Sequence, residues 1–302
     1  MDILKDTKID FIGKRYYAFI FSAILALLGI AAAVFIPLGK ANLGIDFTGG
    51  VALHLKFEKP FALEDARKIL DNYGFKDVEL QQFAGNNRLL IRLKKAEGEL
   101  KATSDKITQA FAKEFADNKF IVESNTVVGP TVGKKLQKDA LWAVGISLLG
   151  ILVYVAWRFE LIFGIAAVIA TFHDVLAVLG VFYVLNKEIN LLIITALLSL
   201  AGYSLTDTVV VFDRIRENLR KRGKEVIENV INNSINEVLS RTIVTSGTTL
   251  LVLIALLAAG GEVIHDFSLA LFLGVLVGTY SSIFVASPLL LLWKGKRGRL
   301  IR

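Results

Sequence analysis

The 302-residue chain is 54% hydrophobic and 21% charged, has a formal net charge of +7, and contains no cysteine. This composition is too apolar for an ordinary soluble domain and is typical of a chain embedded in a lipid bilayer. The absence of cysteine excludes disulfides, thiolate metal sites and cysteine nucleophiles.

Six apolar stretches divide the chain, and each is long enough to cross a hydrocarbon core of about 30 Å as a helix. They are predicted at 16–36, 140–157, 161–185, 191–212, 243–259 and 267–293. Helices are expected because a spanning segment must satisfy its own backbone hydrogen bonds. The fold class is therefore a polytopic α-helical membrane protein, with a first transmembrane helix at 16–36 and a five-helix transmembrane region over 140–293.

The segment 37–139, between the first and second spans, predicts a small α+β domain. Alternating apolar residues and turn signals indicate strands at 51–57, 78–83, 88–94 and 120–128, and helices at 61–73 and after Thr103 or Ser104. The second and third strands flank a hairpin signal at 84–87. The order β-α-β-β-α-β is that of the ferredoxin-like fold, which suits many functions.

Lysine and arginine gather in three segments that lie on one side of the membrane if there are six spans. These are the N-terminal tail 1–15, a basic loop at 213–242 and the C-terminal tail 294–302. The positive-inside rule predicts that they are cytoplasmic and that 37–139 is extracytoplasmic, or periplasmic. The positive charge then follows from topology, and no nucleic-acid partner is expected. Within the basic loop, residues 226–239 predict an amphipathic helix, lying on the inner membrane surface or packed against other cytoplasmic segments.

Ionisable residues inside the predicted spans are the strongest functional signal, because a charge at the bilayer centre costs at least about 2.5–3.5 kcal/mol. His173 and Asp174 fall near the middle of the third span, and Asp207 falls toward the inner end of the fourth. Counting residues places Asp174 roughly 20 Å and Asp207 roughly 8 Å from the inner boundary. Asp207 is therefore predicted to pair with Arg241, at the start of the fifth span, while Asp174 lies too far along the axis to share a proton with it.

Two polar stripes run along the fourth and fifth spans at helical spacing. They consist of Ser199, Tyr203, Ser204 and Asp207, and of Arg241, Thr245, Thr248 and Thr249. Facing stripes predict either a path for protons or ions or a helix-packing seam. A buried carboxyl group beside an arginine is poised between its neutral and charged forms, which suits a proton carrier, and a structural intramembrane ion pair is the alternative.

Other charged residues give weaker signals. Asp213, among neighbouring charges, predicts a solvated cluster at the membrane interface. His54 and His265 have no ligand constellation, so no metal site is expected.

Several motifs resemble a known family. The run NLGIDFTGG at 42–50 resembles a signature of the SecD/SecF family of protein-export membrane proteins, and GYSLTDTVVVFDRIREN at 202–218 resembles the fourth-span motif of its SecF members. The motifs Phe172-His173-Asp174 and VGPTVG at 128–133 also fit, and the resemblance covers nearly the whole chain. The family is related to the resistance-nodulation-division transporters.

The resemblance implies a subunit of the Sec protein translocase rather than an enzyme. It implies SecD, the SecYEG channel and the translocating preprotein as partners, in the cytoplasmic (inner) membrane. It further implies that the proton-motive force promotes export and that the outer domain moves with the proton cycle. Asp207 and Arg241 would be the proton-relay residues, and no cofactor is expected besides the coupling ion, H⁺ or Na⁺. Because the chain has no SecD half, it is expected to need that partner.

Residues 173, 174, 203, 204, 245 and 248 stand as further relay or polar-stripe candidates. In the 42–50 signature, Gly44, Asp46, Gly49 and Gly50 predict a hinge or a tightly packed turn beside the first span.

Three rival functions are weighed. An intramembrane aspartyl protease needs two carboxyl groups at one depth, and Asp174 and Asp207 are predicted to lie roughly 12 Å apart along the axis. A half-unit of a proton-driven small-molecule or lipid exporter from the related superfamily is a closer alternative than the protease. A purely structural membrane scaffold is the third, and it predicts that Asp207→Asn leaves function intact.

Overall fold

The structure is a computed structural model that describes residues 7–36, 38–75, 78–83, 87–94, 100–221 and 225–293. The chain forms two compact units. The helical unit comprises residues 1–42, 142–187 and 192–302, and the sheet unit comprises residues 43–141 and 188–191.

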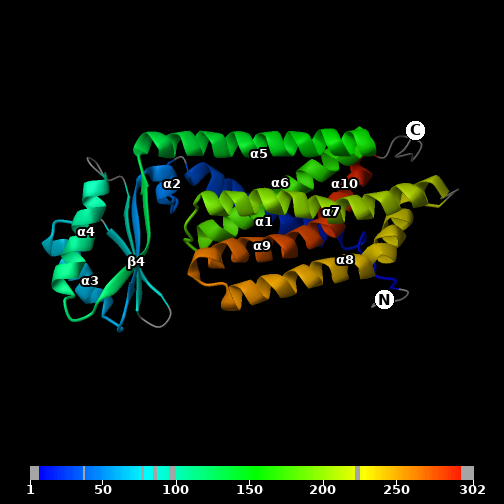
Figure 1. Ribbon diagram of the computed structural model, residues 1–302. Helices are drawn as coiled ribbons and strands as arrows, with labels where there is room; N and C mark the ends of the chain where they lie inside the picture. Colours follow the sequence, from blue (N-terminus) through cyan, green and yellow to red (C-terminus); the bar gives the residue numbers. More distant parts are fainter. Residues whose placement is uncertain are drawn as a thin grey trace. The chain divides into compact units, whose positions relative to one another are not determined.

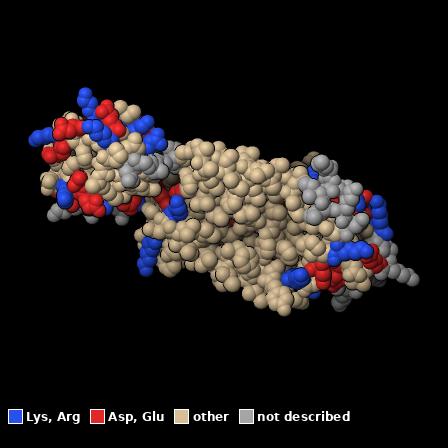
Figure 2. Space-filling view, turned by 90° about the horizontal axis from the view of Figure 1, so that it is seen from below, with Lys and Arg blue, Asp and Glu red and all other residues tan. Residues whose placement is uncertain are grey.

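The helical unit is built from long apolar helices (Figure 1). They are α1 (Arg15–Phe35), α5 (Pro130–Arg158, from Trp142 on), α6 (Leu161–Val184), α7 (Leu191–Lys221), α8 (Ile227–Ala259) and α9 (Glu262–Ser281). Within the described part of the chain, six helical segments are long and apolar enough to cross a membrane, the last running on to Leu292. The six predicted spans are therefore confirmed. The face of this bundle seen in Figure 2 is made up mostly of residues other than Lys, Arg, Asp and Glu.

The last span is not one regular α-helix. After α9 the chain forms a π-turn, η1 (Ser282–Ala286), then α10 (Ser287–Leu289) and the short 3₁₀ segment η2 (Leu290–Trp293). Pro288 has no backbone N–H and so interrupts the regular α-helical ladder. The Ser287 hydroxyl donates to the Ser282 carbonyl at 2.7 Å, which satisfies one of the acceptors in this turn.

The segment 213–242, predicted as a basic loop, is instead formed by the ends of two helices. Helix α7 continues to Lys221 and α8 already begins at Ile227. Hydropathy marks only the apolar part of a helix, so the polar helix ends were assigned to a loop. Except for the exposed Val226 that precedes it, the amphipathic stretch 226–239 is the first part of α8, and its apolar side chains from Ile227 on pack in the core of the helical unit together with Phe11 and Ile12. It is therefore a packed helix that is continuous with the fifth span.

The sheet unit holds four antiparallel strands in the order β2-β3-β1-β4. Its elements are α2 (Ile45–Thr48), β1 (Gly50–Phe57), α3 (Leu63–Asn72), β2 (Val78–Gln82), β3 (Arg88–Lys94), α4 (Leu100–Glu114) and β4 (Phe120–Val128). This order is that of the ferredoxin-like fold, as predicted. Residues 84–86 of the predicted hairpin lie outside the described residues, but β2 and β3 do pair.

The two faces of the sheet have different surroundings. Alternate residues of β1, from Val51 to Phe57, pack against α3 and α4 and form the main core of this unit. The opposite face carries a smaller apolar cluster of Ile45, Ala52 and Leu90. Ser104 is buried inside α4, so the prediction that it or Thr103 caps this helix is wrong. The helix begins earlier because Leu100 already belongs to its apolar face.

Candidate functional site

The carboxylate of Asp207 is buried between α7, α8 and α9 of the helical unit. Its Oδ2 accepts a hydrogen bond from Ser246 at 3.0 Å, and its Oδ1 accepts a longer one from Thr245 at 3.4 Å. Ser246 also shares a hydrogen bond with Thr279 of α9 at 2.7 Å. Only 5% of Asp207 is exposed. Neutral hydroxyl groups therefore hold this acid in place from two neighbouring helices.

Arg241 lies one helical turn before Thr245 on α8, whose hydroxyl bonds back to the Arg241 carbonyl at 3.0 Å. Both Arg241 and Asp207 are described residues, and no ion pair within 4.0 Å joins them. The guanidinium acts on the carboxylate only through space. The predicted direct pair is thus not formed in this structure, because the arginine side chain is exposed and turns to a surface cavity. Its role in a proton relay stays a prediction.

That cavity has a volume of about 690 Å³ and reaches from the polar end of α7 into its apolar part. It is lined by Tyr154, Leu205, Thr206, Val209, Val210, Asp213, Arg214, Glu217, Val238 and Arg241. Thr206 immediately precedes Asp207 in the chain. The cavity therefore comes within one residue of Asp207 along α7, although the carboxylate itself does not line it.

Asp174, on α6, lies in a second and tighter network. Its Oδ2 accepts hydrogen bonds from Ser204 of α7 at 2.5 Å and from Ser281 of α9 at 2.8 Å. Its Oδ1 lies 2.9 Å from Nδ1 of His173. Asp174 is completely buried, and the Nε2 of His173 is buried without a hydrogen-bond partner in the part of the chain described. Three helices thus converge on this one carboxylate.

The predicted axial separation of the two acids is too large. Ser204, the partner of Asp174, precedes Asp207 by three residues, which is about 4.5 Å of helix rise. The count placed Asp207 near the end of its helix because it stopped at Phe212, whereas α7 continues to Lys221. The acids nevertheless do not form a catalytic dyad, since each takes its donors from different hydroxyl groups.

Helix α9 serves both networks because it approaches α7 closely. A Cβ added at Gly278 would lie 3.1 Å from Cβ of Ser204, so glycine permits this approach. Thr279 then joins the network of Asp207, and Ser281 donates to Asp174. Ser246, Thr279 and Ser281 were not predicted. The signal available was small hydroxyl residues within apolar spans, one of them next to Thr245.

Besides the arginine, four members of the predicted polar stripes do not bond to the carboxylates, and two of them, Ser199 and Thr249, donate to backbone carbonyls one turn earlier on their own helices. The Thr248 hydroxyl donates to the Thr245 carbonyl at 2.9 Å. The Tyr203 hydroxyl is buried, and it has no hydrogen-bond partner among the described residues. Helix periodicity identified the face but not which side chains on it touch. Nor do the described residues contain a group of three or more His, Asp or Glu side chains that could hold a metal ion.

The glycine signature of the sheet unit packs against residues 188–191, which lead into α7. The Gly44 amide donates to the Ile189 carbonyl at 2.9 Å, and the Leu191 amide donates to Oδ2 of Asp46 at 2.9 Å. Leu191 is the first residue of α7, so Asp46 satisfies one of the free N–H groups at that helix end. A Cβ at Gly44 would collide with Glu188. The structure shows a tightly packed turn here, and the hinge stays a prediction.

The other two signature glycines meet backbone requirements. Gly49 has φ +74°, a conformation that favours glycine, and a Cβ there would lie 3.0 Å from Pro130. Gly50 has φ +144°, and the space a side chain would need is filled by the Leu93 carbonyl. These contacts fix the start of β1 against β3 and against the segment that opens α5.

A buried acid, Glu188, faces this same region of the sheet. One of its carboxylate oxygens lies 2.5 Å from a guanidinium nitrogen of Arg92, at ion-pair distance though without hydrogen-bond geometry. Burial raises the pKa of Glu188, and the charges of Arg92 and Lys94 oppose that rise. His54 shares the face, and its pKa is lowered by burial and by Arg92. Residue 188 was not singled out in the sequence because it lies in a short connection.

Comparison with known proteins gives a consistent set of relatives. The family profile "Protein export membrane protein SecD/SecF, C-terminal" matches residues 107–296. Protein translocase subunit SecF of Thermodesulfovibrio yellowstonii is 53% identical over 294 residues, covering 97% of both chains. The subunit SecF of Calditerrivibrio nitroreducens is 46% identical and covers 98% of both.

Two solved structures also match. The crystal structure of SecDF from Thermus thermophilus, a translocon-associated membrane protein, superposes with a TM-score of 0.83 at 38% identity. SecDF in a super-membrane-facing form gives a TM-score of 0.69 at the same identity. The chain is covered to 96% and 97%, but it spans only about two fifths of each SecDF chain, 39% and 40%.

Proposed function

The chain belongs to the SecD/SecF family of protein-export membrane proteins, and we propose that it is the subunit in which Asp207 couples proton movement to preprotein export. Its full-length relatives are translocase subunits, and it is itself a multi-pass membrane subunit of the Sec translocase. In the proposal it works with a SecD partner, which would supply the part of SecDF that this chain does not match.

The setting of Asp207 carries the proposal. The acid is held by hydroxyl groups rather than by an ion pair, so it can change charge without breaking a permanent partnership. The cavity lined by Thr206 and Arg241 opens toward the polar helix ends, and in the proposal protons reach the carboxylate from this end, past Arg241. A charge that crosses the membrane releases about 2.3 kcal/mol per 100 mV, which is enough to bias a conformational equilibrium.

The proposal also assigns the sides of the membrane and a link between α7 and the sheet unit. In this proposal the basic end of α7 is cytoplasmic and the sheet unit is extracytoplasmic, as the positive-inside rule predicts. There it acts on the emerging preprotein delivered by the SecYEG channel. Asp46 accepts from the amide of Leu191, the first residue of α7, and Glu188, three residues earlier in the chain, pairs with Arg92 of β3. A shift of α7 would therefore reach the sheet unit through this connection.

The test is preprotein export in cells that express the chain at matched level with its partner subunits. Asp207→Asn is expected to lower the rate of proton-driven export about tenfold or more, equivalent to ~1.4 kcal/mol or more. The matched control is Asp139→Asn, an exposed acid of α5 that lines neither cavity, which should export normally. Normal export by Asp207→Asn, or equal loss in both variants with the complex intact, would show that Asp207 does not titrate in the working cycle.

A further inference from the structure

Two arginines that have no role in the proposed proton transfer meet beside the turn between α5 and α6. Arg158 ends α5, and its guanidinium lies 5.1 Å from the centre of the Phe159 ring. Arg216 of α7 lies 5.6 Å from the same ring, and its Nη1 donates to the Arg158 carbonyl at 3.2 Å. Phe159 itself is buried. One fixed ring therefore positions two guanidinium groups from different helices.

These arginines border a surface hollow of about 450 Å³, which we call the phosphate hollow. It is lined by Arg158, Asp213, Arg216, Glu217, Arg220 and Lys221. Four cations thus face two carboxylates. A guanidinium group presents a planar fork of donors that matches the oxygens of a phosphate group.

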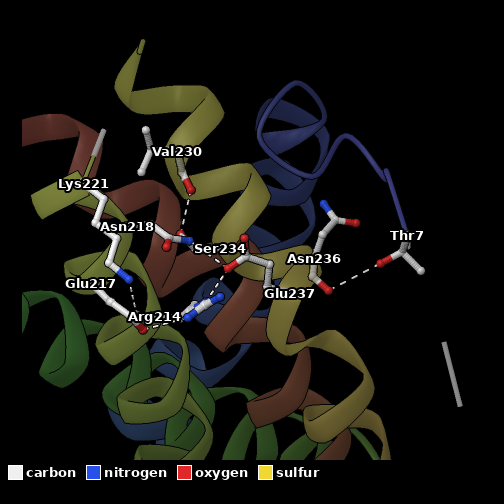
Figure 3. Close-up of polar contacts among 9 residues, drawn as sticks. All are labelled: Thr7, Arg214, Glu217, Asn218, Lys221, Val230, Ser234, Asn236 and Glu237. Atoms are coloured by element: carbon white, nitrogen blue, oxygen red, sulfur yellow. Dashed lines mark hydrogen bonds and ion pairs between the residues drawn. The ribbon is translucent and has the colours of Figure 1, made fainter. Parts of the chain in front are cut away.

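The two carboxylates of the hollow already have cationic partners. Glu217 accepts from Arg214 and from Lys221, each at 2.7 Å (Figure 3). Asp213 lies 3.7 Å from Arg158, a long ion pair. Neither Arg216 nor Arg220 forms an ion pair with an acid among the residues that the structure describes. The hollow therefore keeps an excess of positive charge that suits an anion.

The neighbourhood of the hollow indicates what kind of anion this is. Asp213 and Glu217 also line the 690 Å³ cavity described above, so the two spaces adjoin. The cavity continues along the apolar side chains of Val210, Val209 and Leu205. From Asp213 to Leu205 the helix rises about 12 Å. A basic hollow followed by an apolar groove at the edge of a bilayer has the shape and polarity of a phospholipid.

We propose that the phosphate hollow binds the headgroup of an anionic phospholipid, with the acyl chains lying along the groove beside α7. The phosphate would accept from Arg158, Arg216 and Arg220. Basic pockets between membrane helices are the sites that anionic lipid headgroups occupy. The site depends on the membrane location of the helices and not on the transport role of Asp207.

The experiment uses the purified full chain in nanodiscs of phosphatidylcholine with a minority of phosphatidylglycerol. After gentle extraction into detergent, native mass spectrometry counts the lipids of each class that stay bound. Wild type is expected to retain phosphatidylglycerol in preference. The double variant Arg158→Gln/Arg216→Gln should lose that preference about tenfold, because charge-assisted hydrogen bonds to the phosphate are removed. The matched control is Lys8→Gln/Lys14→Gln, which removes the same charge from exposed side chains of the N-terminal segment that packs on α8.

Each outcome decides the proposal. Loss in the arginine variant alone supports it. Equal retention in all three proteins, or equal loss in both variants, overturns it, since the attraction would then be general surface charge. Full displacement of the lipid by excess inorganic phosphate also overturns it, because the site would then serve a soluble anion. If the double variant does not fold, Arg220→Gln, whose side chain is exposed, takes its place with a smaller expected loss of about threefold.

Discussion

Two buried carboxylates in the helical unit have similar neighbours and different surroundings. Asp174 accepts from Ser204 and Ser281 and contacts His173, and no part of it is exposed. Asp207 accepts from Ser246 and only weakly from Thr245, and it lies beside a cavity. Each acid is held between three helices, but the contacts of Asp174 are shorter and its burial is complete, whereas Asp207 is slightly exposed and close to a cavity.

The two settings indicate a structural role for Asp174 and a role in proton transfer for Asp207. A carboxylate with three short contacts holds α6, α7 and α9 together, and its loss leaves buried donors unpaired. A proton carrier must also release what it binds, which requires an access route and few competing donors. We therefore infer that Asp174 organises the bundle, whereas Asp207 works in the cycle.

The largest expected effect is on stability, in Asp174→Ala. The hydroxyls of Ser204 and Ser281 and the ring of His173 would lose their common partner, at a cost of about 1–3 kcal/mol for each buried donor. The measurement is the thermal unfolding midpoint of the purified chain in detergent, with Asp213→Ala as control. If the midpoint is unchanged while export stops, Asp174 belongs to the proton path and the contrast drawn above is wrong.

The next largest effect is a difference in how readily a reagent reaches the two acids in the wild-type chain. A hydrophobic carbodiimide that labels protonated carboxyl groups inside membranes should modify Asp207 about tenfold faster than Asp174, a difference of ~1.4 kcal/mol in accessibility. Peptide mass spectrometry after a short exposure gives both rates. The control is Asp207→Asn, in which the peptide containing residue 207 should stay unlabelled. Faster labelling of Asp174 would reverse the assignment.

The sequence was sufficient to find both acids but not to tell them apart. Charges are costly inside spans, so Asp174 and Asp207 stand out in any apolar stretch. Their depths were misjudged because hydropathy does not report where a helix ends, and α7 extends nine residues past the predicted end at Phe212. Serine and threonine are common in membrane helices, so nothing distinguished Ser246 or Ser281 before packing was known.

In the sheet unit the sequence predicted the elements well but missed a contact between distant segments. Alternation and turn signals predicted its strands and their order closely, because register follows directly from the hydrophobic pattern. The pattern could not indicate that Glu188, from a distant connection, would lie against Arg92 on the open face of the sheet. Contacts between segments far apart in sequence carry no local signal.

The smallest expected effect is that of Glu188 on stability, but its pH dependence has a definite direction. Unlike the two acids in the helices it faces an arginine, but burial still raises its pKa above 4.5, with Arg92, Lys94, Glu79 and Asp46 as the charged groups that act on it. The folded chain then holds a proton that the unfolded chain has released. The contribution of Glu188 to stability is therefore greatest at low pH and falls as the pH rises through the window above 4.5.

His54, on the same face, has the opposite sign. Its pKa is lowered below 6.5, so the folded chain binds this proton less tightly, and stability is lost as the pH falls through the window below 6.5. The two contributions oppose each other in the wild-type chain. Glu188→Gln should leave stability that rises with pH, and His54→Gln should leave stability that falls with pH.

The measurement is hydrogen-exchange protection of the β1 and β3 amides in the full-length chain, corrected for the intrinsic pH dependence of exchange. The effect of Glu188, the more deeply buried of the two side chains, is expected to be larger than that of His54. Slopes of the same sign in both variants would contradict the opposite pKa shifts of Glu188 and His54. Opposite slopes would show that this face of the sheet responds to pH beside the residues that open α7, and would separate that response from the titration of Asp207.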